Sequence, residues 1–523
     1  MRSSRFMVLL FAALALLAFA AQFAIDFSED NIAANCLVLA SSLAILLYIL
    51  WTDAIQTHPL STFAIFGFCV TTQLGALLAQ SAYWTPLAQN LRQPVETFAT
   101  LAFYQSIAIA AHGLYRVLST FRGKRQSTSL VRSTLQSIGL YDTPSAGTLW
   151  VMGVFGLLNL LMAGGAGIAS KVAQGFSFAV WAPFLIPMYV LEQGSSYCNA
   201  RKNYFFLGAY VLLIAAIAIA INARSLMLAG LMTIALFGIL SAMRSHHKVR
   251  ASQVGKIALV ILLCGVATIP LSELVTAMGL ARGARANAGP MKMIEETLYY
   301  LSEPQLLRAE QDRTKHISLN SNYDETYFSS SLIGRLVETK FHDNALYFAS
   351  RLSDRDEARL LDLTTDLFWS TLPDPMLKAM SIGVDKQELR FSMGDYLSYL
   401  AGSGDLGGYK TGSHLGQGQA VFGVAYPVVY FFLCLLLFIC VDVLAYRNAQ
   451  GGMWISALGM LGIWRMFQYG ISAESLHFLF MSIVRGLPQN LALYLLIYYL
   501  SRAVARFLAQ LTGVTTQGAL ALR

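Results

Sequence analysis

Arginines in unusual places are the first residues of this sequence that could do chemistry. Arg224 stands in Ile-Asn-Ala-Arg-Ser-Leu, between two apolar stretches, and Arg465 lies near the end of another apolar stretch. Arg485 follows further along, and Arg282 and Arg285 open the one long polar stretch of the chain. A guanidinium group binds an oxyanion through two parallel hydrogen bonds. These five side chains therefore predict a binding site for a diphosphate at the boundary of a lipid phase.

Arg224 is open to two interpretations. It precedes the apolar stretch 225–243, so it would lie at the N-terminus of a helix, where the helix dipole favours a bound anion. Alternatively, its side chain only extends to the outer lipid headgroups. Ionisable residues within membrane segments are functional by default, and we therefore favour the anion site.

Two residues near the membrane surface could move a proton. His414 lies in Gly-Ser-His-Leu-Gly, just before an apolar stretch, and a histidine can act as a base near neutral pH. The glycines beside it predict room for a substrate to approach. Glu474, His477 and Arg485 would fall within about 80° of one face if a single helix covered 473–487. Either His414 or Glu474 could be the base, or Glu474 could only pair with an arginine.

Several well-known catalytic patterns are absent from the sequence. It has no G-x-x-x-x-G-K-[ST], no G-x-S-x-G and no H-E-x-x-H, so nucleotide hydrolysis and zinc-protease chemistry are not expected. The six cysteines lie in apolar or short basic stretches and have no zinc-binding spacing. We therefore expect no metal site and no cofactor.

The composition shows what must position these residues. The 523 residues are 56% hydrophobic and only 13% charged, whereas soluble proteins average about 25% charged residues. The sequence therefore predicts an all-α polytopic membrane protein. Apolar stretches of bilayer length predict about twelve spans, at 6–25, 33–52, 60–80, 97–117, 148–168, 176–192, 204–222, 225–243, 256–275, 419–443, 453–470 and 489–508.

Basic residues orient the chain, because positively charged connections remain on the cytoplasmic side of a membrane. If both termini are cytoplasmic, nearly all the short basic connections fall on that side. The exceptions among the short connections are Arg92, Lys171 and Arg224. This bias accounts for the formal net charge of +8, so we expect no nucleic-acid partner.

The same orientation places the long polar stretch, 278–417, outside the membrane. Between Arg282 and Lys410 it carries fifteen Lys and Arg against nineteen Asp and Glu. Its Leu, Glu, Arg and Ala residues at helical spacing, with Ser353 and Asp354 as a signal for the start of a helix, predict a mostly helical cap without a sheet. The predicted parts are spans one to nine in 1–277, the cap in 278–417, and spans ten to twelve in 418–523 with an interfacial helix near 473–487.

Short motifs connect the chain to a known family. They are Asn-Ala-Arg-Ser-Leu at 222–226, Gly-Ser-His-Leu-Gly-Gln-Gly-Gln-Ala-Val-Phe-Gly at 412–423, Glu-Ser-Leu at 474–476 and Arg-Gly-Leu-Pro-Gln at 485–489. With these motifs and one large late loop, the chain resembles the Wzy-type O-antigen or oligosaccharide repeat-unit polymerases. These belong to the O-antigen ligase and polymerase superfamily of GT-C glycosyltransferases. The resemblance covers about 204–506, and the first six spans match only in being apolar.

The resemblance implies a polysaccharide polymerase. Such an enzyme transfers an undecaprenyl-diphosphate-linked glycan onto a lipid-linked repeat unit at the outer, periplasmic face of the bacterial inner membrane, without a metal or nucleotide cofactor. By resemblance, Arg224 binds the donor diphosphate and Arg282 and Arg285 line the donor path. His414 stands where related ligases carry their loop histidine. In those ligases a glycine follows the histidine at a longer spacing than the nine residues from His414 to Gly423.

Other functions fit the same features. An O-antigen ligase-like glycosyltransferase would transfer the glycan to a different acceptor. A transporter or flippase for lipid-linked oligosaccharides would also have many spans and a cationic cavity, although transporters more often show broken helices near the midplane. The expected partners are the undecaprenyl-diphosphate-linked oligosaccharide, membrane lipids, and a chain-length regulator and flippase of the same pathway.

Overall fold

The computed structural model forms two compact units. The first unit contains 1–120, 242–439 and 465–483, and the second contains 121–241, 440–464 and 484–523. The structure describes residues 3–124, 130–162, 173–245, 270–281, 289–315, 323–328, 330, 332–372, 374–447 and 452–511.

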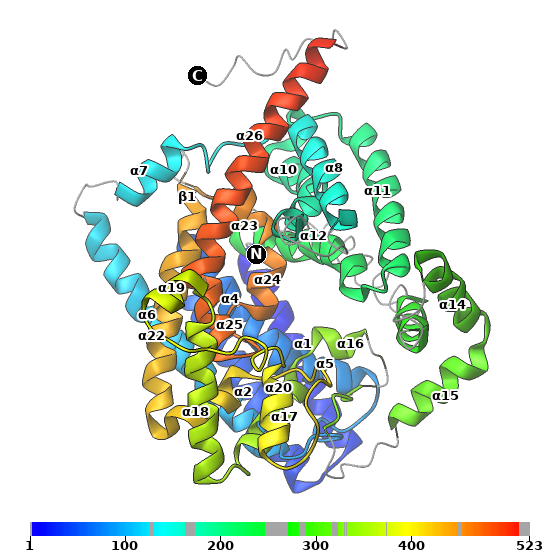
Figure 1. The fold of residues 1–523 in the computed structure, drawn as a ribbon, viewed down its shortest axis with the longest axis vertical. Helices are drawn as coiled ribbons and strands as arrows, with labels where there is room; N and C mark the ends of the chain where they lie inside the picture. Colours follow the sequence, from blue (N-terminus) through cyan, green and yellow to red (C-terminus); the bar gives the residue numbers. More distant parts are fainter. Residues whose placement is uncertain are drawn as a thin grey trace. The chain divides into compact units, whose positions relative to one another are not determined.

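The described residues are mostly helical, and many of the helices are long and apolar (Figure 1). A polypeptide in hydrocarbon must satisfy its backbone hydrogen bonds internally, which a helix does. The chain is therefore a helical, multi-pass membrane protein, as its composition predicts. Within the described residues, eight helical runs are long and apolar enough to cross a membrane, namely Ser3–Ile25, Glu29–Thr52, Pro59–Ala82, Ala173–Gln193, Ala200–Ala220, Leu226–Arg244, His414–Leu444 and Leu476–Leu511.

The remaining predicted spans have different outcomes. The span at 97–117 lies within the 31-residue helix α6, Pro94–Lys124, and the span at 148–168 begins in the shorter α8, Ala146–Met162. Most of 256–275 lies outside the described residues.

Residues 453–470 are not the single helix that their hydropathy predicts. Strand β2, Met453–Ile455, pairs with β1, Ala445–Arg447, in an antiparallel hairpin. Two helices follow, α23 at Ala457–Leu461 and α24 at Ile463–Tyr469. At about 1.5 Å per residue, neither could cross about 30 Å of hydrocarbon.

In the first unit, the N-terminal helices are α1, Ser3–Ile25, α2, Glu29–Thr52, and α3, Ala54–Thr57. Polar side chains inside the apolar helices satisfy one another. Gln73 donates to Gln105 at 2.8 Å, and Gln105 donates to the carbonyl oxygen of Ser41 at 2.7 Å. Next come α4, Pro59–Cys69, the π-helical η1, Val70–Leu74, and α5, Gly75–Ala82.

The described residues of the long polar stretch form helices joined by loops, and no strand occurs among them. Ser353 caps α18 by accepting a hydrogen bond from the backbone of Asp356, as its sequence predicts. The helices of this stretch are α14, Pro290–Ser302, α15, Pro304–Lys315, α16, Ile333–Leu336, α17, Thr339–Ala349, α18, Asp354–Trp369, α19, Asp374–Ala379, α20, Met393–Leu400, and α21, His414–Phe422. A small apolar core that includes Ala345, Phe348 and Leu360 holds four of these helices together, namely α17, α18, α20 and α21.

In the second unit, α8 packs closely against η2, Ser177–Phe184. A Cβ atom at Gly156 would lie 2.0 Å from the backbone nitrogen of Val180, so only glycine allows this approach. The second unit also contains α7, Leu130–Ser137, α10, Leu185–Gln193, α11, Ala200–Ala220, α12, Arg224–Arg244, and α26, Leu487–Leu511.

Candidate functional site

The hairpin before Arg224 has the form that its sequence predicts. Helix α11 ends at Ala220 and α12 begins with Arg224, so the connection is short. Asn222 adopts the left-handed conformation with φ of +51°, which turns the chain. Arg224 is half-buried and occupies the first residue of α12. The helix N-terminus beside it is the feature that favours an anion.

The other predicted arginines have more varied settings. Arg465 is exposed on α24 of the first unit, with its guanidinium carbon 5.2 Å from the ring centre of Phe478. Arg485 is exposed in the π-helical segment η7, Ser482–Gly486. Arg282 and Arg285 lie outside the described residues. The shared diphosphate site of these arginines therefore remains a prediction.

His414 is fully buried at the first residue of α21. Its Nδ1 atom lies 2.6 Å from the hydroxyl of Tyr426, and its ring stacks on the ring of Tyr430 with centres 5.5 Å apart. Its Nε2 atom is buried and has no hydrogen-bond partner among the described residues. Because buried polar atoms are nearly always paired, this nitrogen marks His414 as a candidate for chemistry.

The glycines around His414 do not leave room for a substrate, which corrects the expectation from the sequence. A Cβ atom at Gly418 would lie 2.2 Å from the ring of Tyr426, and one at Gly416 would lie 2.6 Å from the carbonyl oxygen of Ala345. These glycines therefore let α21 pack against α17 and α22, Tyr426–Val441.

Glu474 lies in a loop, so the predicted helix from 473 to 487 is also corrected. Ser475 caps α25, Leu476–Met481, by accepting a hydrogen bond from Phe478, and the helix begins only after Glu474. It then continues through η7 into α26, as one helical run to Leu511. Glu474 therefore does not share a helix face with His477.

The structure nevertheless brings the two predicted proton-transfer residues to adjoining segments. The backbone nitrogen of His414 donates to the carbonyl oxygen of Ala473 at 3.0 Å. Glu474 as a whole residue is exposed to solvent. Partial burial of its carboxyl group, with the negative charges of Glu325 and Asp395, raises the pKa of Glu474. A carboxyl group with a raised pKa is better suited to accept a proton.

A buried polar cluster around His342, on α17, was not predicted. Its Nδ1 atom lies 2.7 Å from the hydroxyl oxygen of Ser413, and its Nε2 atom lies 2.9 Å from that of Ser472. Ser472 donates a hydrogen bond to Oε2 of Glu338 at 2.7 Å. Burial raises the pKa of Glu338 to about 8 and lowers that of His342 to about 3. At neutral pH, His342 is therefore uncharged and Glu338 is mostly protonated.

A second buried group fixes the beginning of α17. Asp343 accepts hydrogen bonds from the backbone nitrogens of Arg92 and Gln93, at 2.9 to 3.0 Å. It also pairs with the ammonium group of Lys340 at 2.9 Å, and both side chains are almost fully buried. The only signal in the sequence was the density of polar residues in Glu-Thr-Lys-Phe-His-Asp-Asn at 338–344.

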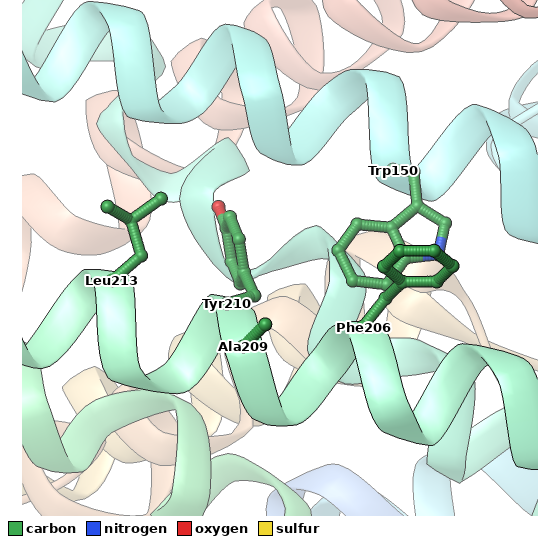
Figure 2. Close-up of a pocket in the computed structure, with 5 residues that line it drawn as sticks. All are labelled: Trp150, Phe206, Ala209, Tyr210 and Leu213. Atoms are coloured by element: carbon green, nitrogen blue, oxygen red, sulfur yellow. The ribbon is translucent and has the colours of Figure 1, made fainter.

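An apolar pocket of about 440 Å³ lies in the second unit, between α8 and α11 (Figure 2). Figure 2 shows the ring of Trp150 facing Phe206, with Tyr210 and Leu213 further along the same helix. The hydroxyl group of Tyr210 already donates to the carbonyl oxygens of Gly153 and Val180, each at 3.0 Å. The lining residues are Trp150, Phe206, Ala209, Tyr210 and Leu213, so the pocket is mostly apolar and aromatic.

Comparisons with known proteins leave the function to be inferred from these residues. No family model matches the chain, and no curated protein or solved structure matches it. Among the described residues, no group of three or more His, Cys, Asp or Glu side chains is placed to hold a metal ion.

Proposed function

We propose that the protein is a polysaccharide polymerase. It transfers an undecaprenyl-diphosphate-linked glycan onto a lipid-linked repeat unit at the outer face of the bacterial inner membrane. The chain's resemblance to Wzy-type polymerases and its many apolar helices support this proposal. The observation that carries it is His414, a buried histidine with an unpaired ring nitrogen at the end of the long polar stretch.

The proposed reaction needs one nucleophile, one leaving group and one base. An acceptor hydroxyl oxygen attacks the anomeric carbon of the donor, and the bond from that carbon to the diphosphate oxygen breaks. The undecaprenyl diphosphate leaves with the electron pair, and the hydroxyl proton goes to the base. Charge grows on the leaving group, so positive groups placed there lower the barrier.

Arginines supply that positive charge in the proposal. Arg224 binds the diphosphate at the N-terminus of α12, with the helix dipole acting in the same direction. Arg282 and Arg285 line the path of the donor. Arg465 and Arg485 are both exposed and are further candidates for binding the substrate. A membrane enzyme built in this way needs no metal or nucleotide cofactor for the transfer.

His414 is the proposed base, acting through Nε2, since Tyr426 engages Nδ1. Because His414 is fully buried, this role requires the hydrogen bond between its backbone and Ala473 to open when the acceptor binds. Glu474 is the alternative base, because it is exposed, adjoins His414 in space and has a raised pKa. A chain-length regulator and a flippase of the same pathway would act on the same lipid-linked substrate.

Reconstitution tests this function. The full chain is placed in vesicles with an undecaprenyl-diphosphate-linked oligosaccharide isolated from cells that lack the gene. A ladder of lipid-linked products that differ by one repeat unit supports the polymerase. Transfer to a different acceptor, with no ladder, would instead indicate a ligase.

A transporter is the second candidate, because irregular segments interrupt some of the apolar helices. The apolar run 59–82 changes to a π-helix at Val70–Leu74 and buries Gln73 there. Irregular helices within spans are common in transporters. Movement of the intact lipid-linked oligosaccharide across vesicles, without any elongation, would favour this candidate over the polymerase.

Topology is a separate test of the same proposal, which places 278–417 in the periplasm and both termini in the cytoplasm. In a variant without its natural cysteines, Ser302→Cys on α14 should react with an impermeant reagent added outside intact cells. Ser133→Cys on α7 should react only after the membrane is opened. Both positions are exposed. The reversed pattern would contradict the proposed orientation.

A further inference from the structure

Four buried side chains form a continuous series of hydrogen bonds in the first unit. Ser413 contacts His342, His342 contacts Ser472, and Ser472 contacts Glu338, at 2.7, 2.9 and 2.7 Å. No member is more than 3% exposed. The series therefore runs through the interior, from the residue directly before His414 to a carboxyl group.

The donors and acceptors along this series have one consistent direction. When Glu338 is ionised, Ser472 uses its hydrogen to donate to Glu338, so the Nε2–H group of His342 donates to the oxygen of Ser472. Nδ1 of the neutral ring is then an acceptor, and the hydroxyl of Ser413 donates to it. Every member can also work in the opposite direction after one proton has moved along the series. Such a series can conduct a proton without leaving a charge on the histidine.

Glu338 is suited to be the end of the series. Its Oε2 atom accepts from Ser472, whereas its Oε1 atom is buried and has no partner among the described residues. An ionised carboxylate that is buried with one oxygen unpaired is costly, and a proton removes that cost. Burial accordingly places the pKa of Glu338 near 8, within reach of physiological pH.

Few other titratable groups act on Glu338. Among the described residues, Tyr469 on α24 interacts electrostatically with Glu338, and Arg335 at the end of α16 and His342 on α17 lie close to it in the chain. His342 is neutral, Tyr469 has its pKa raised above its ordinary value, and Arg335 is exposed to solvent. None of the three supplies a buried positive charge that would keep Glu338 ionised.

We propose that Ser413, His342, Ser472 and Glu338 form a proton relay, which carries the proton released by the acceptor hydroxyl from the first turn of α21 to the carboxyl group of Glu338. The base gives its proton to the hydroxyl oxygen of Ser413 as Ser413 gives its own proton to Nδ1 of His342. Nε2 of His342 gives its proton to Ser472, and Ser472 gives its own to Oε2 of Glu338. One proton enters, one is stored, and no electron moves. This role rests on the proposed glycosyl transfer, because the buried base in that reaction must lose its proton after each cycle.

Infrared difference spectroscopy tests the stored proton without any glycosyl transfer. The full chain in detergent is titrated from pH 6 to pH 10, and the spectrum of Glu338→Gln is subtracted. We expect a protonated-carboxyl band that belongs to Glu338 and disappears with a midpoint near the pKa given above. Glu295→Gln, a matched change at an exposed position on α14, should leave this band in place. A carboxylate at Glu338 throughout the range would overturn the proposal.

The pH dependence of polymer formation tests the conduction. Glu338 can receive a proton only when it is ionised, so the wild-type rate should rise with pH and level off above about pH 8. Glu338→Gln and Ser472→Ala should both lose this rise and be slower by at least about tenfold at pH 8, at normal protein levels and melting temperatures. If both variants fold and keep the wild-type profile, the relay is excluded and the series only fixes α17.

The two experiments separate the relay from the proposed function. If the wild-type chain forms no polymer while the infrared band titrates as expected, glycosyl transfer is wrong and the proton site at Glu338 stands. If polymer forms and the band is absent, the transferase stands and the relay is wrong.

Discussion

The first turns of α12 and α17 both contain charged residues, but these charges have different roles. On α17, Lys340 and Asp343 are buried and satisfy each other, so their charges stabilise the fold. On α12, Arg224 places a positive charge at a helix N-terminus, where the dipole disfavours a cation. Its position makes sense if an anion binds there. The charges on α17 therefore have a structural role, and for Arg224 we propose a bound anion as well.

The largest expected effect is a loss of stability when the buried ion pair on α17 is broken. Asp343→Ala leaves Lys340 buried without its partner and removes the acceptor for two backbone N–H groups, which we expect to cost about 3 to 5 kcal/mol. Protein level in membranes and thermal unfolding measure it. Asp374→Ala is the matched control, because Asp374 forms an exposed pair with Lys386 and its loss should change neither quantity. Equal stability of the two variants would contradict a structural role for the buried pair.

The next effect concerns His414. His414→Ala should lower the rate of polymer formation by about 10² to 10⁴, the usual contribution of a general base, while donor binding remains. His414→Gln separates two roles, since glutamine can hydrogen-bond a substrate and cannot take up a proton near neutral pH. An active glutamine variant with an unchanged pH profile would show that His414 only positions the acceptor, and Glu474 would become the base.

Substitutions of Arg224 test whether the start of α12 binds an anion. Arg224→Ala should reduce polymer formation by about 10² to 10³, the loss seen when one group that stabilises growing negative charge is removed. Arg224→Lys keeps the charge and loses the two parallel hydrogen bonds, so its loss should be smaller but clear. Protein level should stay normal in both variants. Full activity of the alanine variant would mean that Arg224 only contacts lipid headgroups.

The sequence predicted features that are determined by residues close together in the chain. The hairpin at 222–224 follows from two apolar stretches with a short gap, and the start of α18 follows from the capping residue Ser353. Hydropathy alone failed at 453–470, because pairing of Ala445 with Ile455 and a turn at Gly462 interrupt the apolar stretch. Helical periodicity failed at Glu474, because the cap at Ser475 starts the helix later.

The cluster around His342 could not be predicted because its contacts are distant in the sequence. Ser472 lies 130 residues from His342 and 134 from Glu338, and Ser413 lies 71 residues from His342. No spacing within one segment reveals such contacts. Glu338 and His342 are one helical turn apart, which in a soluble cap suggests an exposed face, and only the tertiary packing shows that this face is buried.

The smallest expected effect is a dependence of stability on pH. The pKa of Glu338 in the folded chain, about 8, is above its ordinary value, so the folded state binds more protons than the unfolded state between these two values. Stability from this group is therefore complete at acidic pH and declines as pH rises towards 8. Glu338→Gln cannot ionise and escapes this decline. From pH 6 to pH 9, its melting temperature relative to the wild type should rise by more than about 2 °C, roughly the shift that 1 kcal/mol produces in a large domain. Glu295→Gln should show no such trend, and a constant difference between Glu338→Gln and the wild type would mean that Glu338 does not titrate in this range.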